Sequence, residues 1–249
     1  MIDHISVVIM AKNAQDTLAL SLDSLKAFHE VILYLNDSTD DTEAIAKKYL
    51  NVKIIKGEFL GFGETKNKAG EYAENDWILS LDSDEILTTK LIEEISSQEY
   101  SDNTTLFRLK RNNYFLGHKT QNSDHIVRIY NKKYTKFNDN KVHESVIVPK
   151  ESQVITLKNS FKHLNIININ QTLTKLIMYT DLGAKEKKTC YFIVVIVKPM
   201  FAFFKTYIIQ GNFLRGWVGF TVAINSANKR YYKYLKQFIN CKDPQEDQK

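Results

Sequence analysis

Two aspartates separated by one residue, Asp82 and Asp84, are the strongest candidates in this chain for binding a metal ion or taking part in a reaction. They follow the apolar run 77–81, which is typical of a buried strand. Side chains at positions i and i+2 of a strand point the same way, so we expect two carboxylates at the C-terminal edge of a sheet. Open α/β sheets bind ligands at that edge. Carboxylate oxygens suit Mg²⁺, which is commonly shared with substrate phosphates. The alternative is that either aspartate caps a helix.

A second segment suits a diphosphate. Gly61 and Gly63 form a flexible turn, and Lys66 and Asn67 follow on the first turns of an expected helix. A lysine near a helix start is a natural contact for phosphate oxygens. The chain contains neither the dinucleotide fingerprint Gly-x-Gly-x-x-Gly nor a P-loop, which argues against a nicotinamide enzyme and a P-loop ATPase.

The elements that must position these residues alternate along the first hundred positions. Strands are expected at 5–9, 31–35, 52–56 and 77–81, and helices at 14–29, from Thr39 or Asp40 onward, and at 63–73. Asp40-x-x-Glu43 resembles a capping box. Strands that alternate with helices predict a parallel sheet built from βαβ units.

The pattern changes after residue 100. Strand-like runs at 106–110, 126–130 and 142–148 have no helices between them, which predicts a mixed or antiparallel extension. From Gln171 onward the chain reads as helical. The expected class is therefore an α/β fold with a helical C-terminal extension, divided into residues 1–100, 101–165 and 166–249.

Charge and cysteine usage add further expectations. Residues 1–100 carry 19 acidic and 9 basic side chains, whereas residues 101–249 carry 10 acidic and 25 basic ones. This asymmetry indicates an anionic partner for the second half, with a solvated charged face as the alternative. Cys190 and Cys241 form no metal or redox motif and fit a reducing compartment without disulfides. The N-terminus shows no secretory signal. The best apolar run, 191–197, is broken by Lys198 and Pro199, so no span of transmembrane length is expected.

The C-terminal region combines cations with aromatic residues. Between Lys185 and Phe238 there are ten lysines or arginines and one acidic residue, Glu186. Basic and aromatic side chains on helices suit the headgroup layer of an anionic membrane. The alternative is a helix packed on the core with solvated lysines. Single-stranded nucleic acid uses similar side chains, but no RNA-binding signature accompanies them, and no nucleic-acid partner is expected.

Several motifs occur together in one order. They are Ser6-Val-Val-Ile-Met-Ala-Lys12-Asn13, Asn36-Asp37-Ser38-Thr39-Asp40-Asp41-Thr42, Gly61-Phe-Gly63 with Lys66-Asn67, and Leu81-Asp82-Ser-Asp84-Glu85. This series resembles the nucleotide-sugar domain of the inverting, GT-A-fold glycosyltransferases of family 2. Three later motifs, Arg111-Asn-Asn-Tyr-Phe-Leu-Gly117, Val127-Arg128-Ile-Tyr and Val142-His143-Glu144, resemble a branch that contains bacterial glucosyltransferases of the lipopolysaccharide or lipooligosaccharide inner core.

The resemblance implies roles for individual residues. The positions matching the donor site are Ala11, Asn36, Asp37, Asp40, Lys66, Asn67 and Asp82. Asp82 and Asp84 match the metal motif for Mg²⁺ or Mn²⁺, and His163 is a further candidate ligand, although a lone histidine is more often structural. The family often has an aspartate that contacts the base at the end of the second strand. Here Leu35 stands at that place, and Asn36 or Asp37 is the candidate substitute.

The reaction itself indicates what else is needed. Inverting transfer requires a carboxylate that deprotonates the acceptor hydroxyl and a cation that stabilises the departing diphosphate. In the family a downstream acidic residue is the base, which here points to Glu144, with a surface carboxylate as the alternative. His143 is expected to position the acceptor. Arg111 and Arg128, together with Arg108, are candidates for acceptor phosphates, with solvated strand arginines as the alternative.

These observations predict a metal-dependent inverting hexosyltransferase. The resemblance implies glucose from UDP-glucose as the donor group and a lipopolysaccharide-type core sugar as the acceptor, at the cytoplasmic face of the bacterial inner membrane. One alternative is a haloacid-dehalogenase-like phosphatase. In those enzymes the Asp-x-Asp pair normally lies on the first strand, whereas here it follows the fourth. The other is a non-enzymatic adaptor for membrane or nucleic acid, which leaves Asp82 and Asp84 without a purpose.

Overall fold

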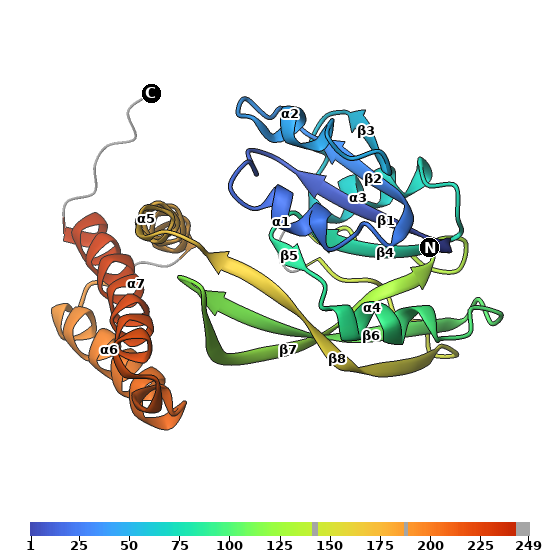
Figure 1. Ribbon diagram of the computed structural model, residues 1–249. Helices are drawn as coiled ribbons and strands as arrows, with labels where there is room; N and C mark the ends of the chain where they lie inside the picture. The colour runs from blue at the N-terminus through green and yellow to red at the C-terminus, as the bar shows by residue number, and fades with distance from the viewer. Residues whose placement is uncertain (141–143, 187–188, 243–249) are drawn as a thin grey trace. The chain divides into compact units, whose positions relative to one another are not determined.

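The computed structural model describes residues 1–140, 144–186 and 189–242. The chain divides into two compact units. The first contains Met1–Asn112 and Ser123–Leu164, and the second contains Asn113–Asn122 and Asn165–Lys249. Figure 1 shows a strand-rich part and a helical part that correspond to these units.

Four parallel strands form the centre of the first unit. They are β1 (Ile2–Ala11), β2 (Phe28–Leu35), β3 (Val52–Lys56) and β4 (Trp77–Asp82), in the spatial order β3-β2-β1-β4. Ala11 pairs with Leu35, and Met10 pairs with Asp82, so the carboxyl ends of the three central strands lie at one edge. The predicted parallel sheet is confirmed, because short apolar runs buried on both faces make such strands recognisable.

Four helices accompany these strands: α1 (Leu18–Asp23), α2 (Thr42–Ala46), α3 (Phe62–Glu71) and α4 (Thr89–Ser96). The helix expected over 14–29 is much shorter, because the chain enters β2 at Phe28, whose side chain is fully buried. The capping box does not form. Instead, Asp40 accepts hydrogen bonds from the backbone N–H groups of Gln15 and Thr42, and Glu43 pairs with lysines. Helix α4 was not predicted.

The remaining strands make the sheet mixed. They are β5 (Glu85–Ile86), β6 (Thr105–Phe115), β7 (His118–Asn131) and β8 (Gln153–Ile166), and the eight strands follow the order β3-β2-β1-β4-β7-β6-β8-β5. Strand β7 runs antiparallel to β4. The predicted strand at 142–148 begins outside the described residues, and its described part forms a single bridge between Val146 and Phe137. Strand β8 was missed, because its apolar residues alternate poorly with polar ones.

Apolar side chains fill both faces of the central strands. Ile9, Leu33 and Leu79 pack with α1 in one fully buried cluster. Val8 and Ile78 pack on the opposite face against α3. Both faces of β4 are thus fixed by packing, which holds Asp82 rigidly at its end.

The second unit is helical, as predicted for the region after Gln171. It contains α5 (Ile169–Glu186), α6 (Phe192–Phe204), the short segments η1 (Lys205–Ile209) and η2 (Asn212–Arg215), and α7 (Gly216–Lys242). Helix α7 packs against both α5 and α6.

Two expectations fail in this unit. Cys190 and Cys241 form a disulfide, because folding brings together two cysteines that lie 51 residues apart in the sequence. The apolar run does not stop at Lys198 and Pro199. Helix α6 continues through Pro199 into η1, which gives an 18-residue run, Phe192–Ile209, that could cross a membrane by length and composition alone.

Candidate active site

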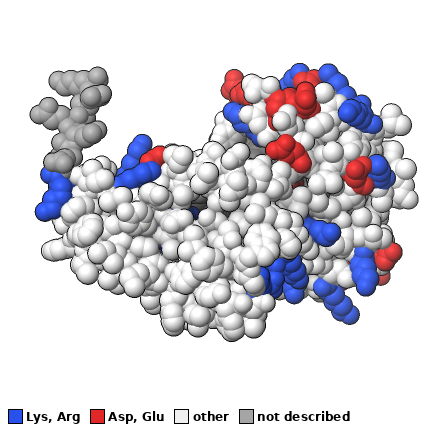
Figure 2. All heavy atoms as spheres, turned by 60° about the vertical axis from the view of Figure 1, so that its left-hand side comes forward, with Lys and Arg blue, Asp and Glu red and all other residues white. Residues whose placement is uncertain are grey.

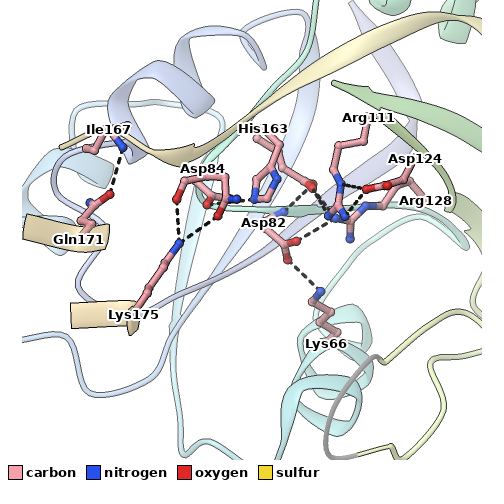
Figure 3. A network of polar contacts seen from close by, with 12 residues as sticks. Lys66, Asp82, Asp84, Arg111, Asp124, Arg128, His163, Ile167, Gln171 and Lys175 are labelled. Atoms are coloured by element: carbon pink, nitrogen blue, oxygen red, sulfur yellow. Dashed lines mark hydrogen bonds and ion pairs between the residues drawn. The ribbon is translucent and has the colours of Figure 1, made fainter. Parts of the chain in front are cut away.

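A buried charge network lies at the carboxyl end of β4 (Figure 3). The Lys66 ammonium, from α3, lies 2.8 Å from Asp82 Oδ1. Arg128 Nη2, from β7, donates to Asp82 Oδ2 at 2.8 Å. The side chains of Lys66 and Arg128 are only 3% and 5% exposed. Each carboxylate oxygen of Asp82 therefore contacts one cation, from α3 on one side and from β7 on the other.

These cations decide the charge of Asp82. Burial opposes ionisation, but the charges of Lys66 and Arg128 outweigh it and hold the pKa of Asp82 far below its ordinary value. Burial likewise opposes the charge of Arg128, but Glu85 and Asp82 raise the pKa of its guanidinium. The network thus presents Asp82 as an ionised group in a fixed orientation.

Glu85 is a site residue to which the sequence analysis gave no role. Its side chain is fully buried, and its Oε2 accepts a hydrogen bond from the Asp82 backbone N–H at 3.0 Å. Its Oε1 accepts from Arg128. Burial raises the pKa of Glu85, and the nearby carboxylates of Asp82 and Asp84 add to this, whereas Arg128 opposes it. The signal that could have found it is its place directly after the Asp-x-Asp pair.

Asp84 and His163, the candidate metal ligands, lie close together. Asp84 Oδ2 lies 3.3 Å from His163 Nε2, and the two side chains are 28% and 16% exposed. Strand pairing brings them together, because Glu85 of β5 lies opposite His163 of β8 and the Leu164 N–H donates to the Asp84 carbonyl. A carboxylate oxygen and an imidazole nitrogen both bind divalent cations.

Contrary to the prediction from the sequence, Asp82 and Asp84 do not lie on one strand. Strand β4 ends at Asp82, and Asp84 lies in the turn before β5, so alternation along a strand does not orient the pair. In the described residues no group of three or more His, Cys, Asp or Glu side chains is arranged to hold a metal ion. The residues that best fit a cation are therefore Asp84 and His163. The role of Asp82 as a direct ligand stays a prediction.

Glu144, the candidate base, belongs to the same network. Its Oε1 accepts a hydrogen bond from Lys66 at 3.0 Å. Lys66 therefore joins Glu144 to Asp82. The Asn67 side chain holds Phe137, which precedes Glu144 in the chain, through two hydrogen bonds. Its amide NH₂ donates to the Phe137 carbonyl, and its amide oxygen accepts from the Phe137 N–H. This double contact favours a positioning role for Asn67. His143 lies outside the described residues.

Arg111 and Arg128, two of the three candidate acceptor arginines, differ in their surroundings. Arg128 is 4% exposed and engaged by two carboxylates, which favours a role in orienting Asp82. Arg111 pairs with Asp124 at 2.7 Å and lies 3.7 Å from Glu85. Its side chain is 24% exposed, so it remains accessible.

The other donor-site candidates gather at the ends of β1 and β2. The Asn36 N–H donates to the Ala11 carbonyl at 3.2 Å. The Asn36 side chain is buried, and its amide oxygen has no hydrogen-bond donor within the described chain. Asp37 follows in a left-handed conformation with φ of 52°. Hydrogen bonds from Thr42 and Gln15 outweigh burial and lower the pKa of Asp40, so this carboxylate braces the loop before α2.

This sheet edge, with its paired carboxylates, cations and candidate base, is equipped for transfer of a group carried on a diphosphate. Residues 6–164 match the model of the family described as Glycosyl transferase family 2, and the chain belongs to this family. It is 30% identical over 254 residues to an uncharacterized glycosyltransferase, RC0292, of Rickettsia conorii, covering 94% of this chain and 89% of that protein.

Two further comparisons are more distant. The chain is 24% identical to the lipopolysaccharide core biosynthesis glycosyltransferase LpsC of Rhizobium meliloti, covering 90% of this chain and 87% of LpsC. The crystal structure of S. aureus TarS 1–349 in complex with UDP aligns with a TM-score of 0.47 at 15% identity, covering 98% of this chain and 93% of that one. Family membership confirms the predicted enzyme class and fold class and excludes the phosphatase and adaptor alternatives.

Proposed function

We propose that this protein is a metal-dependent, inverting hexosyltransferase that moves glucose from UDP-glucose onto a core sugar of a lipopolysaccharide-type acceptor. The observation that carries the proposal is the convergence of Asp84, His163, Lys66 and Glu144 around Asp82 at the carboxyl end of β4. The reaction would take place at the cytoplasmic face of a bacterial membrane.

Asp84 and His163 would hold Mg²⁺ or Mn²⁺, which would stabilise the negative charge that develops on the departing diphosphate. Asp82 is kept ionised and fixed by Lys66 and Arg128. Because Lys66 and Arg128 fix its orientation before a donor binds, Asp82 would accept hydrogen bonds from the sugar without reorganisation. Glu85 supports this geometry by bonding the Asp82 N–H.

Glu144 would act as the base. Its carboxylate takes the proton of the attacking acceptor hydroxyl, whose oxygen forms a bond to the anomeric carbon as the bond to the diphosphate breaks. One direct displacement inverts the configuration of that carbon. Lys66 orients the Glu144 carboxylate through a 3.0 Å hydrogen bond.

The identities proposed for the donor and the acceptor are supported less directly than the reaction type. The buried, unpaired amide oxygen of Asn36 suits the N3–H of uracil, because it is an acceptor at the edge where the family binds its base. The lipopolysaccharide acceptor follows the resemblance and the name of the R. meliloti relative. Arg111 is the accessible candidate for a phosphate on that acceptor.

Thermal unfolding with and without Mn²⁺, over a panel of nucleotide sugars, tests the proposal. Ligands that bind only the folded state raise its melting temperature. We expect the largest rise with UDP-glucose plus Mn²⁺, and loss of the Mn²⁺-dependent part in Asp84→Ala and His163→Ala. The matched control is His29→Ala, an exposed histidine at the other end of β2. An Asp84→Ala enzyme that transfers sugar at the normal rate would rule out this metal assignment.

A further inference from the structure

The C-terminal helices expose an unusual amount of apolar surface. Only 17% of the run Phe192–Ile209 is buried within the protein, although its mean hydropathy is 1.9. Ile209 is 64% exposed, Leu214 is 78% exposed and Trp217 is 59% exposed. Figure 2 shows a broad surface on the helical part with few Lys, Arg, Asp or Glu side chains. Soluble proteins seldom leave so large a contiguous apolar area without a partner.

The most exposed of these side chains lie at the turn of a helical hairpin. Helix α6 packs along α7, and η1 and η2 join the two. Phe192 contacts Phe238 at the open end, and Thr206 bonds Ser226 nearer the turn, so the helices run in opposite directions. We call the segment 205–217 the hairpin tip.

The backbone of the hairpin tip is held in a defined conformation by glycines, a buried hydrogen bond and close packing. Gly211 and Gly216 adopt left-handed φ values of 69° and 55°, which favour glycine. Asn212 is 2% exposed and donates its amide to the Thr206 carbonyl at 2.9 Å. A Cβ on Gly219 would lie 1.8 Å from the Asn212 carbonyl oxygen, so α7 packs closely on η2. This closely packed frame leaves Ile209, Leu214 and Trp217 more than half exposed, although folding rewards burial of such side chains. The Trp217 ring also makes an edge contact with His118 at 5.3 Å between ring centroids.

The charged residues of the hairpin itself have one sign. From Phe192 to Lys242 the sequence contains eight lysines or arginines and no aspartate or glutamate. Four of the cations lie on the second half of α7, away from the hairpin tip: Lys229, Arg230, Lys233 and Lys236. Lys229 and Arg230 are exposed, whereas Lys236 pairs with Asp181 of α5 at 2.6 Å. A protein partner would have to supply the acidic residues that this segment lacks, whereas an anionic lipid surface offers negative charge and apolar chains together.

We propose that the hairpin tip inserts into one leaflet of an anionic bilayer, while the cations of α7 remain among the lipid headgroups. The proposal deepens the proposed location of the enzyme and rests on the proposed function for its biological purpose, but vesicle binding itself requires no sugar donor. The protein therefore lies on the membrane as a monotopic enzyme.

The structure favours this arrangement over a spanning helix. A span over 192–209 would place Lys198 and Pro199 within the hydrocarbon, where a lysine is costly. It would also separate α6 from α7, against which it packs. In the interfacial position the exposed Lys198 lies outside the hairpin tip. Lys205 and Arg215, near the two ends of the tip, can extend their long side chains toward the headgroups.

Vesicle binding with tryptophan fluorescence tests the insertion. The chain has two tryptophans, and Trp77 is 6% exposed in the core of the first unit, so Trp217 reports on the lipid. With phosphatidylcholine vesicles that contain phosphatidylglycerol, we expect a blue shift of the emission and strongest quenching by lipids brominated near the headgroup end of the acyl chain. Binding should weaken with salt and fall at least tenfold with pure phosphatidylcholine, because the cations lose their partners.

Substitutions locate the contact. Leu214→Asp and Ile209→Asp should each lower vesicle affinity about tenfold or more. Leu50→Asp, at a fully exposed leucine of the first unit, should leave it unchanged. Absence of binding to anionic vesicles would overturn the proposal, and so would quenching that is strongest at the bilayer centre. Tip variants that change the oligomeric state and leave vesicle affinity intact would instead identify a second copy of the chain as the partner and refute membrane insertion. Loss of UDP-glucose binding with vesicle binding retained would contradict only the proposed function.

Discussion

Replacing Arg128 by methionine tests whether the buried charge network holds the site together. Methionine keeps much of the aliphatic volume and removes the guanidinium that Asp82 and Glu85 share. The Glu85 side chain is 0% exposed, so its carboxylate would lose its nearest cation without access to water. The remaining guanidinium, that of Arg111, lies 3.7 Å away.

Breaking a buried ion pair from one side typically costs about 3–5 kcal/mol. We expect a loss of about 3 kcal/mol, because Arg111 still faces Glu85 and Lys66 still holds Asp82. For a chain of this size, such a loss corresponds to a fall of roughly 6–12 °C in melting temperature. Arg108→Met is the matched control on neighbouring β6, since Arg108 makes no ion pair within the described residues. It should cost less than about 1 kcal/mol.

The assay is denaturant unfolding followed by the fluorescence of Trp77, which lies on the same strand as Asp82, in a Trp217→Phe background. The pH dependence has a defined sign. The folded-state pKa of Glu85 is raised, so its ionisation costs stability as pH rises above the unfolded value. Without Arg128 the pKa of Glu85 rises further, and protonation of Glu85 removes more of the cost of burying its charge. The difference in free energy of unfolding between variant and wild type should therefore shrink from pH 7.5 to pH 5. Asp82 stays ionised over this range, because even the ordinary pKa of an aspartate, 3.8, lies below it.

A second substitution checks the cause. Adding Glu85→Gln to Arg128→Met removes the unpaired buried charge, and it should recover at least half of the lost stability. The reasoning is refuted if Arg128→Met costs less than about 1 kcal/mol, or if its cost is the same at both pH values and the double variant shows no recovery.

Other perturbations address the remaining contacts. Glu144→Gln should lower turnover by at least about a hundredfold and leave calorimetric UDP-glucose affinity within twofold; an unchanged rate would reassign the base. Gly63→Ala would place a Cβ 2.0 Å from a backbone oxygen of the loop that carries Glu144, and chemical denaturation should show a loss of about 1–3 kcal/mol. Gly70→Ala in the same helix meets no atom within 4 Å and should gain about 0.5–1 kcal/mol, so equal effects would disprove the close approach. Cys241→Ser opens a disulfide that spans 51 residues and should lower the stability of the helical unit by up to about 4 kcal/mol. A thiol assay that finds both cysteines reduced in the wild-type protein would contradict this prediction.

The sequence was sufficient for features that depend on neighbours along the chain. Apolar runs located β1 to β4, β6 and β7, because a buried strand needs only a few consecutive apolar residues. The helical character of the C-terminal region was visible for the same reason. Strand β8 and helix α4 were missed, since β8 has polar residues at many positions and its partners lie far away in sequence.

Within the candidate site, residue types were predictable and pairings were not. The sequence singled out Asp84 and His163, and the structure brings them to 3.3 Å. It also placed Arg128 among acceptor contacts, whereas the structure turns its guanidinium toward Asp82 and Glu85. No local pattern contains that information, because 46 residues separate Arg128 from Asp82.

What the sequence determined by itself is therefore the chemistry available to this protein: family membership, a parallel sheet with carboxylates at its edge, and a basic, aromatic C-terminal region. Only the tertiary structure decided which charges neutralise one another, which carboxylate remains accessible to a cation, and which apolar side chains stay on the surface. The physical reason is that burial and ion pairing depend on distances between segments remote in sequence. These distances are fixed only when the sheet, the charge network and the helical hairpin have packed.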